Sequence, residues 1–392
     1  MKPSKYDRRK FLRSATAATS AAGLLSVFPK ELLANQIDKP TIMESNVAPG
    51  KNPDPKINFS VIGINHGHIY SQTDAVIRGG GQLVSFHAKE DDLAAAFSKK
   101  YPLAKRVMDE KEILEDKSIQ LVLSSIIPNE RAPLGIRVMQ HGKDYMSDKP
   151  GITSLEQLKE VRRVQKQTGR IYSIMYSERF ENKATVKAGE LVKAGAIGKV
   201  IQTIGLGPHR ISLTTRPPWF FDKKYFGGII TDIASHQFDQ FLYFTGSNKA
   251  EVVFSQVGNV AHPQYPLFED FGDVTLNGNG GAGYIRVDWF TPDGLQTWGD
   301  GRLTILGTEG FIEIRKNIDI GGRPGANHLF IVTNKGTQYI DCNNVVLPYG
   351  EQLVNDVLNR TETAMPQEHC FLATELALKA QQQARKLVLD KA

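Results

Sequence analysis

The sequence predicts an α/β fold, in which an N-terminal doubly wound parallel sheet precedes a C-terminal α+β domain with a large, mostly antiparallel sheet. Between residues 57 and 176, short apolar runs alternate with amphipathic segments, as parallel strands alternate with helices. After about residue 180, runs rich in β-branched residues follow one another with few helical segments. The length of 392 residues is normal for two domains.

The expected elements follow from these patterns. In the N-terminal half we expect strands at 57–62, 83–87, 119–125, 144–147 and 171–176. We expect helices at 66–79, 91–101, 132–141 and 154–167, the last two stopping before Gly142 and Gly169, because glycine commonly ends a helix. Later in the chain, a helix at 185–194 precedes strands at 200–204, 251–257, 283–290, 303–306, 311–315 and 329–332. A helix at 368–389 closes the chain.

Residues 1–34 are predicted to be an export leader. Arg8-Arg9-Lys10 precedes Phe11-Leu12 and then a mildly apolar run of Ala, Ser and Thr, which is the order of a signal peptide. The arginine pair followed by Phe-Leu resembles the twin-arginine (Tat) signal. The alternative is an amphipathic surface helix. No clean Ala-x-Ala cleavage site is present, so a cleaved periplasmic protein and a membrane-anchored one both stay open. The proline-containing segment 35–55 is expected to be a linker or arm.

The charge distribution excludes nucleic acid as a partner. The net charge is +6, and residues 1–34 hold seven basic and two acidic residues, leaving only 6 − 5 = +1 for the rest. A nucleic-acid binder keeps its basic surface in the folded domain. The two cysteines, Cys342 and Cys370, fit no metal-ligand spacing and are expected to be free thiols, although one bridge between them is the alternative. We expect no metal site.

A candidate phosphate-binding loop follows the first strand. Against the pattern G-x-G-x-x-G only Gly63 fits, because Asn65 replaces the second glycine, His68 replaces the third, and Gly67 is displaced by one. A plain strand-to-helix turn is the alternative. The strand–helix–strand context favours a dinucleotide site on a Rossmann domain over residues 56–177. The candidate cofactor-binding residues here are Gly63, Asn65, His66, Gly67 and His68.

The second strand carries the signal for cofactor type. A carboxylate at its end normally binds the ribose 2′-hydroxyl of NAD. Here Ala88 stands at that position and Lys89 follows, and a lysine can face a 2′-phosphate instead. We therefore expect NAD(P) as cofactor, with a slight preference for NADP.

Asp148-Lys149-Pro150 follows a predicted strand and resembles the Glu-Lys-Pro signature of the Gfo/Idh/MocA oxidoreductases. Further matches lie at Arg179-Phe180, at 195–200, at Asp232-x-x-x-His236 and at 307–310. They run in family order over residues 57–315. The resemblance implies a substrate and oligomerisation domain over 178–392, and a dimer or tetramer.

By resemblance, Lys149, Asp232 and His236 form the catalytic set. A residue before proline is held extended, so the Lys149 ammonium can polarise a substrate oxygen. Asp232 and His236 are four apart and would share one helix face, so the carboxylate could orient the imidazole. Either His236 or Lys149 would carry the proton. The alternatives are a surface lysine, a helix-capping aspartate and a core histidine.

Two departures from the family leave the substrate open. Many relatives read Pro-Asn-x-x-His, whereas this chain keeps Pro128 and Asn129 but has Ala132 in place of the histidine. Tyr176 stands where many relatives have histidine. Pro128, Asn129, Asp148 and Lys149 join the cofactor-binding candidates by resemblance. The substrate candidates are Tyr176, Arg179, His209, Arg210 and Trp219, for which ordinary packing of Trp219 is the alternative.

The function expected from these features is hydride transfer to or from a sugar, polyol or sugar derivative with NAD(P). The alternative is glycoside cleavage through transient oxidation with no net redox change. A third interpretation, a cofactor-bound sensing protein, is disfavoured by the intact catalytic set. Tat export moves folded proteins, so it favours a tightly bound cofactor loaded before export.

Overall fold

A computed structural model describes residues 54–389 of the chain. The predicted Tat leader and the linker up to residue 53 lie outside the described residues. Within the described range, every helix is too short or too polar to cross a membrane.

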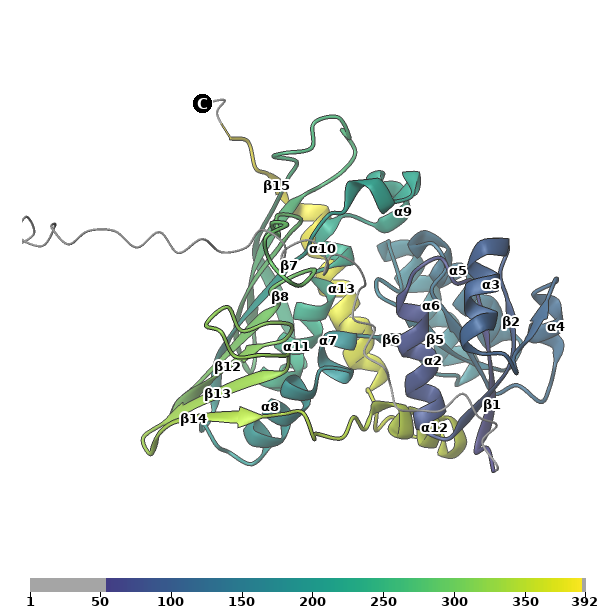
Figure 1. Ribbon diagram of the computed structural model, residues 1–392, viewed down its shortest axis with the longest axis horizontal. Coiled ribbons are helices and arrows are strands. Elements are labelled where there is room, and N and C mark those ends of the chain that lie inside the picture. Colours follow the sequence, from purple (N-terminus) through teal and green to yellow (C-terminus); the bar gives the residue numbers. More distant parts are fainter. Residues whose placement is uncertain (1–53, 390–392) are drawn as a thin grey trace, which may run out of the picture. The chain divides into compact units, whose positions relative to one another are not determined.

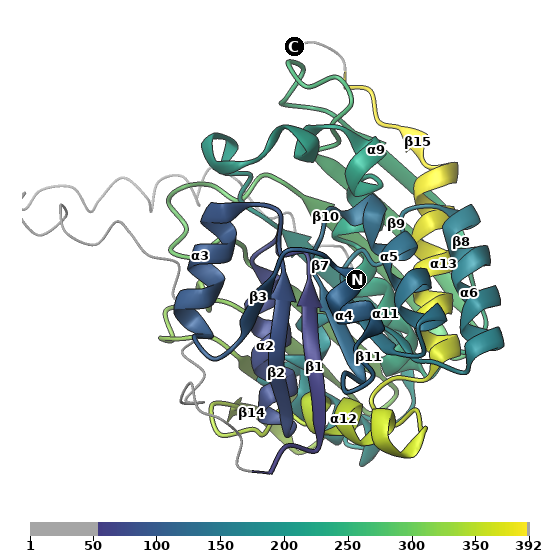
Figure 2. The same ribbon diagram turned by 90° about the vertical axis from the view of Figure 1, so that its right-hand side faces the viewer.

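The first sheet is parallel and has the order β3-β2-β1-β4-β5-β6. Its strands are β1 Ile57–Ile62, β2 Gly81–His87, β3 Lys105–Val107, β4 Leu121–Ser124, β5 Asp144–Asp148 and β6 Tyr172–Met175. Figure 2 shows β1, β2 and β3 side by side. Strands β4, β5 and β6 are buried along their whole length, as strands covered on both faces are. The order reverses between β1 and β4, where such sheets bind ligands.

Helices connect these strands. They are α2 His68–Arg78, α3 Asp91–Lys100, α4 Lys111–Glu115, α5 Pro128–Gln140 and α6 Leu155–Thr168. Helix α6 begins where the Ser154 side chain accepts a hydrogen bond from the Gln157 N–H and ends at Gly169, whose φ is +62°. Helix α5 starts earlier than the expected residue 132, because Pro128 suits the first turn of a helix. The short β3 and α4 were not predicted.

The second sheet is mostly antiparallel, as predicted, with the order β14-β13-β12-β11-β7-β10-β9-β8-β15. Its strands are β7 Val200–Pro208, β8 Ala250–Gly258, β9 Phe271–Gly278, β10 Gly281–Asp288, β11 Arg302–Gly307, β12 Gly310–Arg315, β13 His328–Thr333, β14 Gly336–Asp341 and β15 Arg385–Lys386. Only β7–β10 and β8–β15 pair in parallel. Strands β9 and β14 were not predicted, because glycine and polar residues interrupt the alternation in both.

Helices cover one face of this sheet, and those that contact its strands are α8 Lys183–Lys193, α10 Ile229–Asp232, α11 Ser235–Thr245 and α13 Gln367–Gln383. The other helices of this half are α7 Ser177–Phe180, α9 Lys223–Phe226 and α12 Tyr349–Asn359. Figure 1 shows α11 and α13 on the same side of the sheet, where they contact β7 and β8. The prediction of a helix up to residue 389 was wrong. Helix α13 ends at Gln383, and the chain then forms β15, whose backbone hydrogen bonds to edge strand β8 replace helical ones.

The C-terminal segment returns to the first sheet. Helix α12 packs on α2, and α13 contacts both α6 and β6. The approach of α12 is close enough that a Cβ at Gly79 would lie 2.2 Å from the Gly350 carbonyl oxygen. Cys342 and Cys370 are free and buried, as predicted. The first sheet and strands β8, β9 and β10 therefore share one hydrophobic cluster through these helices, whereas β11, β12 and β13 pack with α8 in a second cluster.

Candidate active site

The loop after β1 is shaped by Gly63. Its φ is +79°, and a Cβ there would lie 2.7 Å from the Cβ of Ile126. Its N–H donates to the His87 carbonyl at 2.9 Å. The positive φ and the lack of room for a Cβ mean that this position requires glycine. Asn65 donates from Nδ2 to Glu90 Oε1 at 2.7 Å. Gly67 precedes α2 with open space beside it.

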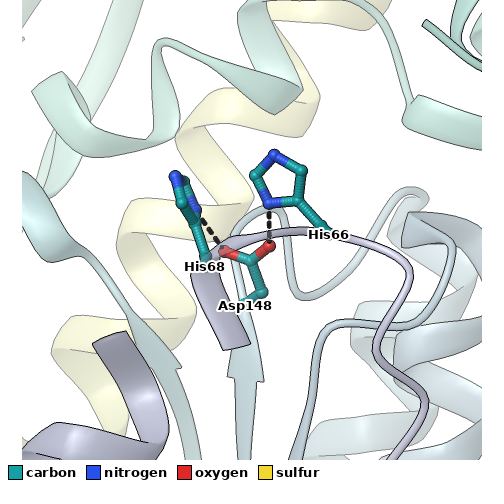
Figure 3. A group of neighbouring side chains, drawn as sticks. All are labelled: His66, His68 and Asp148. Atoms are coloured by element: carbon teal, nitrogen blue, oxygen red, sulfur yellow. Dashed lines mark hydrogen bonds and ion pairs between the residues drawn. The ribbon is translucent and has the colours of Figure 1, made fainter. Parts of the chain in front are cut away.

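Two loop histidines meet the carboxylate at the end of β5. His66 Nδ1 lies 2.9 Å from Asp148 Oδ2, and His68 Nδ1 lies 2.9 Å from Asp148 Oδ1. Figure 3 shows the two imidazoles flanking the carboxylate, with their second ring nitrogens turned away from it. Asp148 also accepts from Arg131 Nη2 at 3.1 Å and from the Lys149 N–H at 2.8 Å. Both of its oxygens are therefore fully used.

Electrostatics fix the protonation of this group. Burial alone would raise the pKa of Asp148, but the adjacent Arg131, His68 and His66 hold it well below its ordinary value. An ionised carboxylate only accepts hydrogen bonds, so both histidines donate through Nδ1–H. Burial, together with His68, lowers the pKa of His66 to about 4, so this imidazole is neutral near pH 7.

Lys149 pairs with Asp232 across the two parts of the chain. The Lys149 Nζ lies 3.0 Å from Asp232 Oδ1, and the lysine is 6% exposed. Asp232 ends the short helix α10, which follows the Gly227-Gly228 turn. Burial would raise the pKa of Asp232, but the Lys149 ammonium outweighs it and lowers the pKa.

The expected single helix carrying Asp232 and His236 is not found. Helix α10 ends at Asp232 and α11 begins at Ser235, so the carboxylate faces Lys149 rather than the imidazole. His236 is 2% exposed, and burial lowers its pKa to about 3. Its Nδ1 is buried and has no hydrogen-bond partner among the described residues. The ring of Tyr176 contacts it edge-on, with centroids 6.3 Å apart.

A buried charge pair behind His236 was missed by the sequence analysis. Glu178 in α7 accepts from Lys316 Nζ and from Gln237 Nε2, the latter at 2.9 Å. Burial opposes ionisation of Glu178, but Lys316 and His236 lower its pKa to about 2. Lys316 follows β12, far along the chain, and no local motif marks either residue. Only the fold brings them together.

The comparisons with known proteins fit this arrangement. Residues 57–176 match the model described as "Oxidoreductase family, NAD-binding Rossmann fold", and residues 185–313 match the "GFO/IDH/MocA C-terminal domain". The chain belongs to the GFO/IDH/MocA oxidoreductase family. The NAD-binding part of the family model covers the whole first sheet, so the loop around Gly63 and the Lys149 turn belong to a dinucleotide-binding enzyme.

Relatives of known structure or name support the assignment. A protein of known structure described as an oxidoreductase, from Erwinia carotovora atroseptica, is 45% identical with a TM-score of 0.82, over 85% of this chain and 100% of its own. The scyllo-inositol 2-dehydrogenase (NAD(+)) of Bacillus subtilis is 26% identical over 72% of this chain and 79% of the relative. Levoglucosan dehydrogenase of Pseudarthrobacter phenanthrenivorans is 25% identical over 50% of this chain and 51% of the relative.

Three of the five predicted substrate residues are committed to protein contacts in this oxidoreductase. The Tyr176 hydroxyl is buried and lies 3.2 Å from Thr374 Oγ1. Arg179 makes two 2.7 Å hydrogen bonds to Asp239. Arg210 donates to the carbonyls of residues 292 and 295. Most of their polar atoms are used in these contacts, although Arg210 Nε is buried without a hydrogen-bond partner in the described chain, and their role as substrate residues stays a prediction.

The other two candidates lie in an aromatic group near the Lys149–Asp232 pair. His209 contacts Trp289 and Trp298, with ring centroids 5.3 and 4.5 Å away. Burial and then Lys149 lower its pKa to about 4. Trp219 is half-buried and packs on Phe220. Arg216, which was not among the predicted substrate residues, stacks on Phe220 and interacts electrostatically with Asp232.

The remaining cofactor candidates lie at the ends of β2 and β4. Lys89 is exposed just after β2. Pro128 is the buried first residue of α5, and Asn129 follows it with a buried Oδ1 that lacks a partner in the described chain. Asn129 also borders a cavity of about 840 Å³ between α5, α6, α9 and α13. Lys149, Asp232 and His236 do not line that cavity.

Proposed function

We propose that this enzyme transfers a hydride between NAD(P) and a carbon that bears a hydroxyl or carbonyl in a sugar, polyol or sugar derivative. The observation that carries the proposal is the Lys149–Asp232 pair at 3.0 Å, at the carboxyl end of β5 in an NAD-binding fold. The relatives named above include an inositol dehydrogenase and a levoglucosan dehydrogenase.

The loop residues fit a dinucleotide. A side chain at Gly63 is excluded, and Gly67 leaves space beside the first turn of α2, which has no side-chain cap. The N–H groups of an uncapped first turn suit a pyrophosphate. When bound, the dinucleotide supplies the nicotinamide ring that accepts or returns the hydride.

The chain's own residues handle the oxygen and its proton. The Lys149 ammonium, held by Asp232, donates a hydrogen bond to the substrate oxygen and stabilises the charge that develops on it. Neutral His236 accepts the hydroxyl proton during oxidation. Its unpartnered Nδ1, together with the buried and unpartnered Thr231 Oγ1 and Trp289 Nε1 within the described residues, supports a polar ligand, because buried polar atoms normally have partners.

Cofactor type, export and assembly complete the proposal. Ala88 in the carboxylate position and the exposed Lys89 support a slight preference for NADP. The arginine pair in the leader supports Tat export with the cofactor tightly bound. The outer face of the second sheet exposes Leu306 and its cross-strand neighbour Phe311, which supports a homo-oligomer. Light scattering of the purified protein measures the oligomeric state.

The decisive experiment uses the mature protein as purified. Any retained dinucleotide is identified by mass spectrometry, and binding of NAD and NADP is then measured by calorimetry. A panel of polyols, aldoses and glycosides is incubated with the enzyme while absorbance at the reduced-nicotinamide band and products are followed. Stoichiometric change in the reduced cofactor supports the proposal. Aglycone release without net redox change would replace it with glycoside cleavage, and no turnover on any class would contradict both.

A further inference from the structure

Three potential metal ligands converge beside Lys149. Among residues 54–389, the single group of three His, Cys, Asp or Glu side chains with donor atoms close enough for one ion is His66, His68 and Asp148, whose donors lie within 4.8 Å of one another. The two histidines come from the loop between β1 and α2, and the aspartate ends β5. The pattern His-x-His plus a distant Asp was not selected from the sequence, which led us to expect no metal.

The donor geometry is close to that of a coordination site. Each Nδ1 lies 2.9 Å from a different oxygen of Asp148. Neighbouring ligands on a tetrahedral ion with bonds of about 2.0–2.2 Å lie about 3.3–3.6 Å apart, so each pair would open by about half an ångström. The imidazoles meet edge to face, with centroids 4.2 Å apart at 76°, and Figure 3 shows both nitrogens directed at the carboxylate from its two sides. An ion would replace the two Nδ1 protons with little movement of the side chains.

We propose that His66, His68 and Asp148 bind a first-row divalent transition-metal ion, with zinc as the reference ion. Two imidazoles and one carboxylate form a mixed nitrogen and oxygen site that leaves coordination positions open. Those positions face outward from Asp148 and would take water or a substrate oxygen next to Lys149. The proposal concerns ion binding by the chain itself and does not depend on hydride transfer.

The charges around the site sum to zero before an ion arrives. Asp148 faces Arg131, but this guanidinium also donates to the backbone carbonyls of Ile126, Lys149 and Pro150, so its charge is shared. Lys149 is paired with Asp232. Two carboxylates and two cations thus balance before the ion arrives. Arg131 then serves as the hydrogen-bonded support that ligating carboxylates commonly have.

The site is reachable and rigid at its base. The side chains of His66 and His68 are 32% and 38% exposed, whereas that of Asp148 is 1% exposed. An ion can therefore approach from the side of the imidazoles, while the buried carboxylate stays fixed by the hydrogen bonds from Arg131 and from the Lys149 N–H, which the ion leaves in place. This combination resembles open metal sites rather than a sealed structural one.

The test uses the full chain freed of metal by chelator and dialysed, and the parent and the variants are compared at equal content of any dinucleotide that stays bound. Zn²⁺ is titrated by calorimetry at pH 7.5, and Co²⁺ is followed by its visible absorption, which reports nitrogen and oxygen ligands directly. We expect one equivalent bound by the parent. His66→Ala and His68→Ala should each weaken binding by at least about tenfold, and Asp148→Asn by about 10–100-fold. His141→Ala, which removes an exposed histidine in the same half, should bind as the parent does.

A second measurement separates binding from folding. Zn²⁺ that binds the native state should raise the thermal unfolding midpoint of the parent and of His141→Ala, but not of the double variant H66A/H68A. Equal Zn²⁺ affinity and equal midpoint shifts in the parent and the double variant would overturn the proposal. So would the absence of one-equivalent Zn²⁺ binding in the parent, whatever its activity with a dinucleotide.

Discussion

The two sides of the catalytic group are built in different ways. Lys149 and its neighbours Asp148 and His66 sit at the carboxyl ends of parallel strands, where backbone geometry places them. His236 and Glu178 come from helices of the second part and are set by a buried network that includes Lys316. In the proposed mechanism, the strand side thus supplies Lys149, the charged group that acts on the substrate oxygen. The helix side supplies an environment that keeps a base neutral.

The largest predicted effect tests the strand side. Lys149→Met removes the only cation paired with Asp232 in the described structure, and with it the hydrogen bond to the substrate oxygen. We expect kcat/KM to fall by about 10³-fold or more, measured by steady-state kinetics with the substrate found above. Lys99→Met, an exposed lysine in α3, is the matched control. Activity of Lys149→Met within tenfold of the parent would remove this residue from the mechanism.

Asp232→Asn tests whether the helix side acts through Lys149. The substitution keeps the size of the side chain but leaves the 6% exposed ammonium without its counter-ion. We expect a fall of about 10–100-fold in kcat with a smaller change in KM, because Lys149 loses its positioning partner. The exposed Asp92→Asn serves as control. A loss confined to KM would show that Asp232 contacts substrate instead of holding Lys149.

The strand side was largely predictable from sequence, and the helix side was not. Asp148, Lys149 and Pro150 are contiguous and lie at the end of a strand, so the local sequence pattern is enough to predict their position. Asp232 and His236 were found by spacing, yet their relation was wrong, because a break at residues 233–234 separates α10 from α11. The Glu178–Lys316 pair spans 138 positions, and no periodicity marks a contact of that range.

The same contrast applies to the predicted substrate residues Arg179 and Arg210. Arg179 and Arg210 are charged residues in plausible loops, and sequence gives no sign that Asp239 and two backbone carbonyls already engage them. Arg179 and Asp239 are both buried. Breaking a buried pair typically costs about 3–5 kcal/mol, so this arginine serves stability.

Gly63 and Gly67 in the loop after β1 test how far backbone geometry alone determines the structure of this loop. Gly63→Ala places a methyl group 2.7 Å from Ile126 Cβ at a φ of +79°, so we expect about 1–3 kcal/mol less unfolding free energy and weaker dinucleotide binding. Gly67→Ala has open space and a φ of −61°, and should change unfolding free energy by less than about 0.5 kcal/mol. Urea unfolding and calorimetry measure both. Similar losses in the two variants would show that the loop geometry is not what demands glycine.

The smallest predicted effect tests the helix side through pH. The pKa of His236 is about 3 in the folded chain against 6.5 for an ordinary histidine. Between these values the unfolded state binds a proton that the folded state does not, so stability falls as pH falls below 6.5, by at most about 1.4 kcal/mol per pH unit from this residue. Well above pH 6.5 neither state binds this proton, and the residue contributes no slope.

His236→Gln removes this titration while keeping a polar side chain. We expect the variant to lose about 2 kcal/mol less unfolding free energy than the parent between pH 6.5 and pH 5, measured by urea unfolding at each pH. The exposed His141→Gln should follow the parent. Glu178 stays ionised over this range because its pKa is about 2, so it does not mask the difference. Identical pH slopes in the parent and His236→Gln would mean that His236 is protonated or solvated in the folded enzyme. The helices around His236 would then not keep its imidazole neutral.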